Sequence, residues 1–178
     1  MLTAAMKSSA RRGLLLAFLA AAGCTASGPA DEAPRAVSRA IDCGRLGAPV
    51  SVDAAAALEQ RNTPIGPLLN VRLQELRKVS PALTPGRKEK TEDRFAGLVP
   101  FVLSESGTHT VLVASLAWAD LGEATPPRLV EPQSFKWIDV CGKKFKSGLY
   151  ALEGGKAYFV QLWDSPDREL AMMIRRLP

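Results

Sequence analysis

The stretch from Gly97 to Ser115 (GLVPFVLSESGTHTVLVAS) constrains the fold more than any other part of the chain. Two apolar runs are joined by Ser-Glu-Ser-Gly, and apolar side chains recur at every second residue: Val99, Phe101 and Leu103 in the first run, Val111 and Val113 in the second. A period of two is typical of a β-strand with one buried face. Because Gly107 can adopt a positive φ in a turn, the stretch predicts a β-hairpin.

The opposite faces of the two runs are also apolar, because Leu98, Val102 and Leu112 lie there. A strand with two apolar faces belongs in the centre of a sheet or under a second layer. We therefore expect the hairpin to be central or covered, and not an exposed edge.

More runs of strand length follow, separated by Gly, Pro, Asp or Ser. They span residues 116–121, 135–140, 145–152, 157–163 and 169–177, with a turn at Pro126-Pro127. About seven to nine short strands at this spacing favour a mainly β fold, a single β-sandwich or jelly roll.

One helix is expected near the start of the folded part. Residues 51–61 (SVDAAAALEQR) predict it, because Ser51 or Asp53 can cap its first turn and its four alanines have high helix propensity. The fold class expected from the sequence is therefore a β-sandwich or jelly roll with one N-terminal helix.

The segment between this helix and the hairpin is ambiguous. Leu69, Val71 and Leu73 alternate as in a strand, but the apolar residues of 68–79 also fit a helical stripe. A strand is the favoured interpretation. The charged run 87–94 (RKEKTEDR) is expected to form a solvated loop.

The first 23 residues have the features of a signal peptide. Basic residues end at Arg11-Arg12, and the apolar run 13–22 that follows is too short to remain in a bilayer as a spanning helix. The sequence Ala21-Ala22-Gly23-Cys24 resembles the lipobox of bacterial lipoproteins, with alanine where leucine is usual at the first position. The resemblance implies cleavage before Cys24 and its lipidation by diacylglycerol and palmitate; an ordinary secretory signal is the alternative.

The expected mature chain begins with the lipidated Cys24 and a Pro-containing flexible tether over 24–40, followed by one domain over 41–178. Thr25 is not the aspartate associated with inner-membrane retention, so we expect an outer-membrane lipoprotein facing the periplasm. The sequence pI is about 9.3. Without residues 1–23, however, only 20 basic residues face 18 acidic ones, which argues against a nucleic-acid partner.

Three cysteines are present, and lipidation of Cys24 leaves Cys43 and Cys141 as a pair. An exported protein with two remaining cysteines is expected to join them in a disulfide. Two buried free thiols are the alternative.

Further motifs resemble a known domain type: Gly97-Leu98 with Phe101, Gly107-Thr108-His109, Trp137-Ile138-Asp139-Val140, and Gly155 with Tyr158 and Gln161-Leu162. The order is similar to the small β-sandwich of pre-peptidase C-terminal type in exported proteobacterial proteins, over about residues 69–178. Members usually carry an aromatic residue where this chain has His109. The resemblance implies a β-sandwich and brings no catalytic residues.

Few residues are candidates for chemistry. His109 is the single histidine and lies among Thr and Val, so a structural role is favoured over a catalytic or zinc-binding one. Asp120 and Asp139 each follow a Trp-x pair and are the candidate carboxylates of a glycosidase, which would need a defined separation. We expect no catalytic residues, no metal site and no cofactor.

The three tryptophans are candidates for a binding surface: Trp118, Trp137 and Trp163. Tryptophan stacks on sugars and anchors protein interfaces, although core packing is its commoner role. Two functions fit the chain, and an enzyme such as a hydrolase is third. The first is a lipid-anchored periplasmic binding or assembly module of the bacterial envelope, with an envelope protein or glycan as its partner. The second is a periplasmic immunity or inhibitor lipoprotein that neutralises a secreted toxin.

Overall fold

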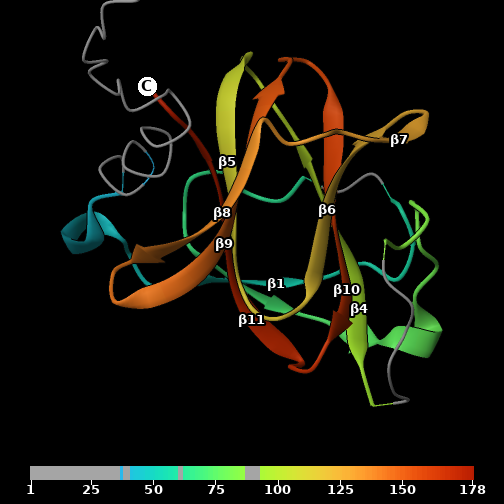
Figure 1. Ribbon diagram of the computed structural model, residues 1–178. Helices are drawn as coiled ribbons and strands as arrows, with labels where there is room; N and C mark the ends of the chain where they lie inside the picture. The colour runs from blue at the N-terminus through green and yellow to red at the C-terminus, as the bar shows by residue number, and fades with distance from the viewer. Residues whose placement is uncertain (1–36, 38–40, 60–61, 87–92) are drawn as a thin grey trace, which may run out of the picture.

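The computed structural model describes residues 37, 41–59, 62–86 and 93–178. The expected signal peptide, Cys24, the tether apart from Val37 and most of the charged run 87–94 lie outside the described residues. The described chain is mainly β, and its strands form two sheets (Figure 1). The strands are β1 (Val50–Asp53), β2 (Leu69–Arg72), β3 (Gln74–Glu75), β4 (Phe95–Val102), β5 (Gly107–Ala114), β6 (Trp118–Ala124), β7 (Pro127–Leu129), β8 (Ser134–Val140), β9 (Lys143–Leu152), β10 (Ala157–Ser165) and β11 (Glu169–Arg176).

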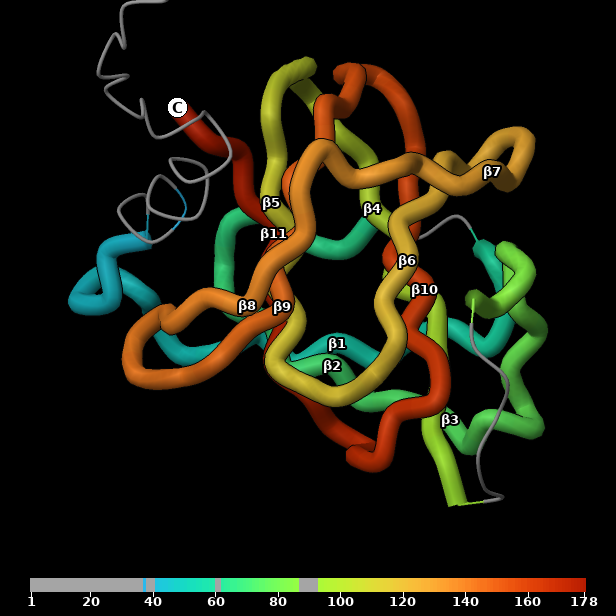
Figure 2. Tube along the Cα trace, in the orientation of Figure 1, coloured from blue at the N-terminus to red at the C-terminus, as the bar shows by residue number. Residues whose placement is uncertain are grey.

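The six-stranded sheet has the order β1-β2-β11-β5-β9-β8, and the five-stranded sheet has the order β3-β4-β10-β6-β7. β1 and β2 are parallel, and the other pairs are antiparallel. The sheets face each other across the main core, with β5, β9 and β11 opposite β4, β6 and β10 (Figure 2). This arrangement confirms the predicted mainly β sandwich.

The two runs of 97–115 bury the faces that the sequence predicts, but they do not pair with each other, so the predicted hairpin is wrong. Val99, Phe101, Val111 and Val113 all lie in the core between the sheets. However, β4 pairs with β3 and β10, whereas β5 pairs with β9 and β11. The link after β4 therefore crosses from one sheet to the other, and Gly107 takes a φ of +151° where β5 begins.

A second link of the same kind lies beside the first. The β9–β10 connection also crosses between the sheets, and it hydrogen-bonds to the β4–β5 link: Gly155 N donates to Leu103 O at 2.7 Å, and Gly154 N donates to Ser106 Oγ at 2.8 Å. The two links lie side by side at one end of the sandwich (Figure 2). Thus β4 pairs with β10 and β5 pairs with β9, so each strand beside the first link pairs with a strand beside the second.

The predicted helix over 51–61 is also wrong, because its described part forms β1 and an irregular segment. Ala54 is buried against Gly97, at which an added Cβ would lie 2.4 Å from the Ala54 Cβ. Ala55 forms an isolated bridge with Leu98. The alanines therefore allow the chain to pack closely on β4, and this tertiary contact overrides their helix propensity.

The favoured strand within 68–79 is confirmed in its first half. Leu69, Val71 and Leu73 belong to the main core, and a short 3-10 turn, η2 (Leu76–Lys78), follows β3. A second such turn is η1 (Cys43–Arg45). In the described part of the chain, no helix is long and apolar enough to cross a membrane.

The N-terminal segment covers the outer face of the six-stranded sheet. Val37 and Ile41 are buried there with Leu112 and Met173. Cys43 and Cys141 form the predicted disulfide, with an S–S distance of 2.01 Å, and it joins this segment to the end of β8. The outer face of the other sheet is covered by residues of 55–58 and 76–83.

Candidate binding pocket

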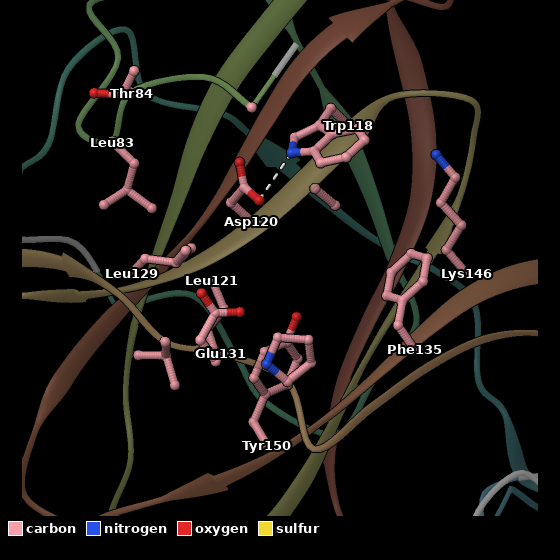
Figure 3. A pocket seen from close by; sticks show the side chains of 14 residues that line it. Leu83, Thr84, Trp118, Asp120, Leu121, Leu129, Glu131, Phe135, Lys146 and Tyr150 are labelled. Carbon is pink, nitrogen blue, oxygen red and sulfur yellow. Dashed lines mark hydrogen bonds between the residues drawn. The ribbon is translucent and has the colours of Figure 1, made fainter. Parts of the chain in front are cut away.

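A pocket of about 710 Å³ lies where β6 of one sheet approaches β8 and β9 of the other. The pocket is lined by β6, by the connection from Leu129 to Pro132, by Phe135 of β8, by Lys146 and Tyr150 of β9, and by the loop 83–86 (Figure 3). Its volume lies within the range common for small-ligand sites.

Apolar side chains that are exposed to solvent concentrate at this pocket. Trp118 is 40% exposed, Phe135 is 51% exposed, and Leu129 is similarly open to solvent. Most large apolar side chains in the described chain are buried, so three exposed ones at one cavity form a local apolar surface. Such surfaces on exported or soluble domains commonly mark binding sites.

The pocket surrounds one edge of β6. Ala119 and Leu121 point to the inner side of the sheet and contact the main core. Trp118 and Asp120 point to the other side, as alternation along a strand requires. Both pairs line the same pocket, so the backbone of β6 itself borders the cavity.

Two sets of hydrogen bonds fix the outer side of the pocket. The indole Nε1 of Trp118 donates to Asp120 Oδ1 at 2.9 Å, as Figure 3 shows. On β10, the fully buried Gln161 accepts hydrogen bonds from the backbone N–H groups of Ala82 and Leu83 at 2.9 Å. This second interaction holds the loop that carries Leu83 against the pocket.

Two glycines allow aromatic rings to pack directly on the backbone at the pocket. An added Cβ at Gly86 would lie 3.1 Å from the Trp118 ring, so this indole packs directly on the loop backbone. At Gly148, an added Cβ would lie 2.6 Å from the Tyr150 ring and hydroxyl. The glycine therefore lets the Tyr150 side chain lie along β9 toward the pocket.

Burial and two carboxylates, Asp120 and Glu131, shift pKa values inside the pocket. Burial raises the pKa of Asp120, and the negative charge of Glu131 acts in the same direction, while the hydrogen bond from Trp118 opposes both. Burial, together with these two carboxylates, raises the pKa of Tyr150 to about 12. The phenol is therefore protonated at neutral pH and can donate a hydrogen bond.

Lys146 supplies the positive charge of the pocket lining. Its Nζ donates a hydrogen bond to the backbone carbonyl of Ala117 at 2.6 Å and lies 5.4 Å from the centre of the Trp137 ring. The ammonium group is thus shared between a carbonyl and an aromatic face.

The structure separates the three candidate tryptophans. Trp118 lines the pocket, and Trp137 lies beside it on β8, half exposed and in contact with the Lys146 ammonium. Trp163 is 3% exposed and packs with Leu76 and Val79 on the outer face of the five-stranded sheet. Two of the three tryptophans are therefore placed near one site.

The other candidates do not gather into a catalytic group. Asp120 lines the pocket, but Asp139 is exposed on β8 and is not part of the lining. His109 is 2% exposed, and its Nδ1 lies 3.1 Å from Gly107 O. Among residues 37, 41–59, 62–86 and 93–178, no group of three or more His, Cys, Asp or Glu side chains could hold a metal ion.

Sequence reasoning missed several pocket residues, namely Leu129, Glu131, Phe135, Lys146 and Tyr150. One signal was available for Phe135, because it shares a strand face with Trp137 while Ile138 and Val140 occupy the opposite face. An edge strand with large apolar side chains on both faces needs a partner on each of them.

The pocket lining offers several kinds of group that can contact a ligand. Apolar and aromatic surface, carboxylates, a phenol and an exposed strand edge all bind ligands through contacts, charge and hydrogen bonds. No protein-family model, no curated protein and no solved structure matches this chain.

Proposed function

We propose that this protein is a lipid-anchored binding or assembly module of the bacterial envelope without catalytic activity, and that the pocket beside β6 is its binding site. The observation that carries the proposal is the group of exposed apolar side chains, Trp118, Leu129 and Phe135, around one cavity of about 710 Å³. Exposing these side chains to water is unfavourable, and a bound partner would remove that cost.

Export is supported by the disulfide between Cys43 and Cys141. Such bonds persist in oxidising compartments, such as the bacterial periplasm, and are rare in the cytosol. The basic and apolar segments of the first 23 residues point in the same direction.

The anchor is proposed from the sequence alone. Cys24 follows the apolar run and the residues Ala21-Ala22-Gly23, which resemble a lipobox. Lipidation there would hold the domain at the outer membrane, facing the periplasm, on a tether that begins at Cys24. Labelling with radioactive palmitate tests this point, because wild type should incorporate label and Cys24→Ser should not.

The binding role is tested in cells by photocrosslinking of the full-length protein. A photoreactive amino acid replaces Phe135 in the pocket, and the control carries it at Arg168, which is exposed on the β10–β11 turn outside the pocket. Crosslinked products specific to position 135 are expected. Equal products, or none, at the two positions would contradict the proposal.

The identity of a crosslinked partner also separates the two functions that the sequence left open. An envelope protein or glycan supports a binding or assembly module. A secreted toxin would instead support a periplasmic immunity or inhibitor lipoprotein that uses the same pocket.

A further inference from the structure

We propose that the pocket binds an extended peptide, which adds a strand to the open edge of β6 and places a basic side chain beside Asp120 between two apolar side chains. This inference rests on the proposed binding function and names the class of partner.

Part of one edge of β6 is open. On the side away from β10, the described strand β7 pairs only with Gly122–Ala124. The carbonyl of Leu121 accepts a hydrogen bond from Val130 N at 2.9 Å, and the carbonyl of Ala117 accepts one from Lys146 Nζ. Alternate residues of a strand direct their N–H and C=O groups to the same edge. Ala119, which lies between these two residues, therefore presents its backbone groups to the pocket.

The cavity extends to both sides of this edge. An added strand has side chains that alternate between two sides, as in β6 itself. On one side they would meet Trp118 and Asp120, and on the other side Leu121 and Tyr150, all of which line the pocket. A cavity confined to one face of the sheet would not offer surfaces to both sets of side chains.

The pocket lining carries more negative than positive side chains. The charged side chains that line the pocket are Asp120, Glu131 and Lys146, so carboxylates exceed ammonium groups. Lys146 already donates to Ala117 O and contacts Trp137. A lysine or arginine of the ligand would therefore face Asp120 and Glu131, with the aromatic face of Trp118 available to it.

The expected length is short. The open part of the edge lies between Ala117 and Leu121, whose carbonyls already accept hydrogen bonds, and at about 3.3 Å per residue this span accommodates roughly three or four residues of added strand. In the ligand, the basic residue lies opposite Asp120, and its two neighbours lie opposite Ala119 and Leu121. The side chains of these two ligand residues enter the apolar side of the pocket. The recognised pattern is therefore apolar-basic-apolar.

The experiment uses detergent-solubilised full-length protein and the peptide acetyl-Gly-Val-Leu-Lys-Leu-Val-Gly-amide. Three matched peptides carry glutamate for lysine, norleucine for lysine, or N-methyl groups on both leucines. Calorimetry measures affinity, and NMR hydrogen exchange follows the Ala119 amide. We expect the lysine peptide to bind at least about tenfold more tightly than the glutamate and N-methylated peptides and to slow exchange at Ala119.

Two variants separate the charge from the apolar contribution. Asp120→Asn should reduce the preference for lysine over glutamate, and it should weaken binding of the lysine peptide more than binding of the norleucine peptide. Asp139→Asn, which removes an exposed carboxylate outside the pocket lining, should change neither.

The inference is wrong if the lysine and glutamate peptides bind within about twofold of each other, if saturation leaves exchange at Ala119 unchanged, or if no peptide binds. The photocrosslinks from position 135 decide the broader proposal separately. Specific crosslinks together with failed peptides would keep the pocket as a binding site for another ligand, whereas absent crosslinks would remove the binding function itself.

Discussion

The Nζ of Lys146 donates a hydrogen bond to the backbone carbonyl of Ala117 at 2.6 Å. Lys146 belongs to β9 of the six-stranded sheet, whereas Ala117 directly precedes β6 of the five-stranded sheet. One side chain thus connects the two sheets at the pocket and occupies a backbone acceptor at the end of the open edge.

Lys146→Met should destabilise the fold by about 1–3 kcal/mol, because methionine keeps much of the aliphatic stem but leaves the carbonyl of the buried Ala117 without its partner. Urea unfolding measures the change. The control is Lys144→Met, on the same strand but exposed, which should have little effect. Equal effects of the two substitutions would show that the bond between the sheets contributes nothing.

His109→Phe or His109→Tyr should retain both the fold and the function in cells, because His109 is buried on a core-facing strand position and is not part of the pocket lining. His109→Asp should destabilise by a few kcal/mol through a buried charge. Thermal melts and a complementation assay provide the two readouts. Loss of function by His109→Phe at an unchanged melting temperature would reopen the enzyme interpretation.

The same histidine predicts a pH effect on stability. Burial lowers the pKa of His109 below its ordinary value of 6.5, so the unfolded chain binds a proton more readily than the folded one. The contribution of His109 to the free energy of unfolding is complete above the pKa that this histidine has in the unfolded chain. It is lost as the pH falls from that value toward the lower pKa of the folded chain. Between about pH 8 and pH 5, wild type should lose more unfolding free energy than His109→Phe. Parallel pH profiles would contradict this assignment.

The double variant Cys43→Ser/Cys141→Ser should lose about 4 kcal/mol, because the bond closes a loop with a sequence separation of 98 residues. Guanidinium unfolding of oxidised wild type and of the variant measures the difference. Reduced wild type should unfold like the variant. An unfolding midpoint that is insensitive to reduction would show that the bond does not stabilise the domain.

Gly97→Ala should destabilise by about 1–3 kcal/mol, because its new Cβ would lie 2.4 Å from that of Ala54. The matched control is Gly47→Ala, where an added Cβ has no atom within 4 Å. A thermal melt distinguishes them, and a stable Gly97→Ala would mean that the segment over β4 is free to move away.

Periodicity in the sequence predicts which faces of a strand are buried, but not which strand lies beside it. Val99 and Val111 both face the core as predicted, since alternation is a local property. The pairing of β4 with β10, and the hydrogen bonds of Leu103 to the β9–β10 link, join residues more than fifty positions apart in sequence. For the same reason, the alanines near Ala54 predict a helix when the contact with Gly97 is unknown.

The pocket was predictable only in part. Trp118 and Asp120 attract attention by residue type, and they lie two residues apart on one strand. Phe135 and Tyr150 belong to the other sheet, so their approach to β6 depends on how the two sheets stack. The disulfide was easier to predict, because export and the cysteine count suffice to suggest it.

In the envelope, a partner is expected to occupy the open edge of β6 and its pocket. Hydrogen–deuterium exchange followed by mass spectrometry tests it directly on the full-length protein, in isolated envelopes and after purification in detergent. We expect slower exchange in envelopes for fragments that contain 118–121, with unchanged exchange for β11 (Glu169–Arg176) as internal reference. Identical exchange of 118–121 in the two samples would contradict it.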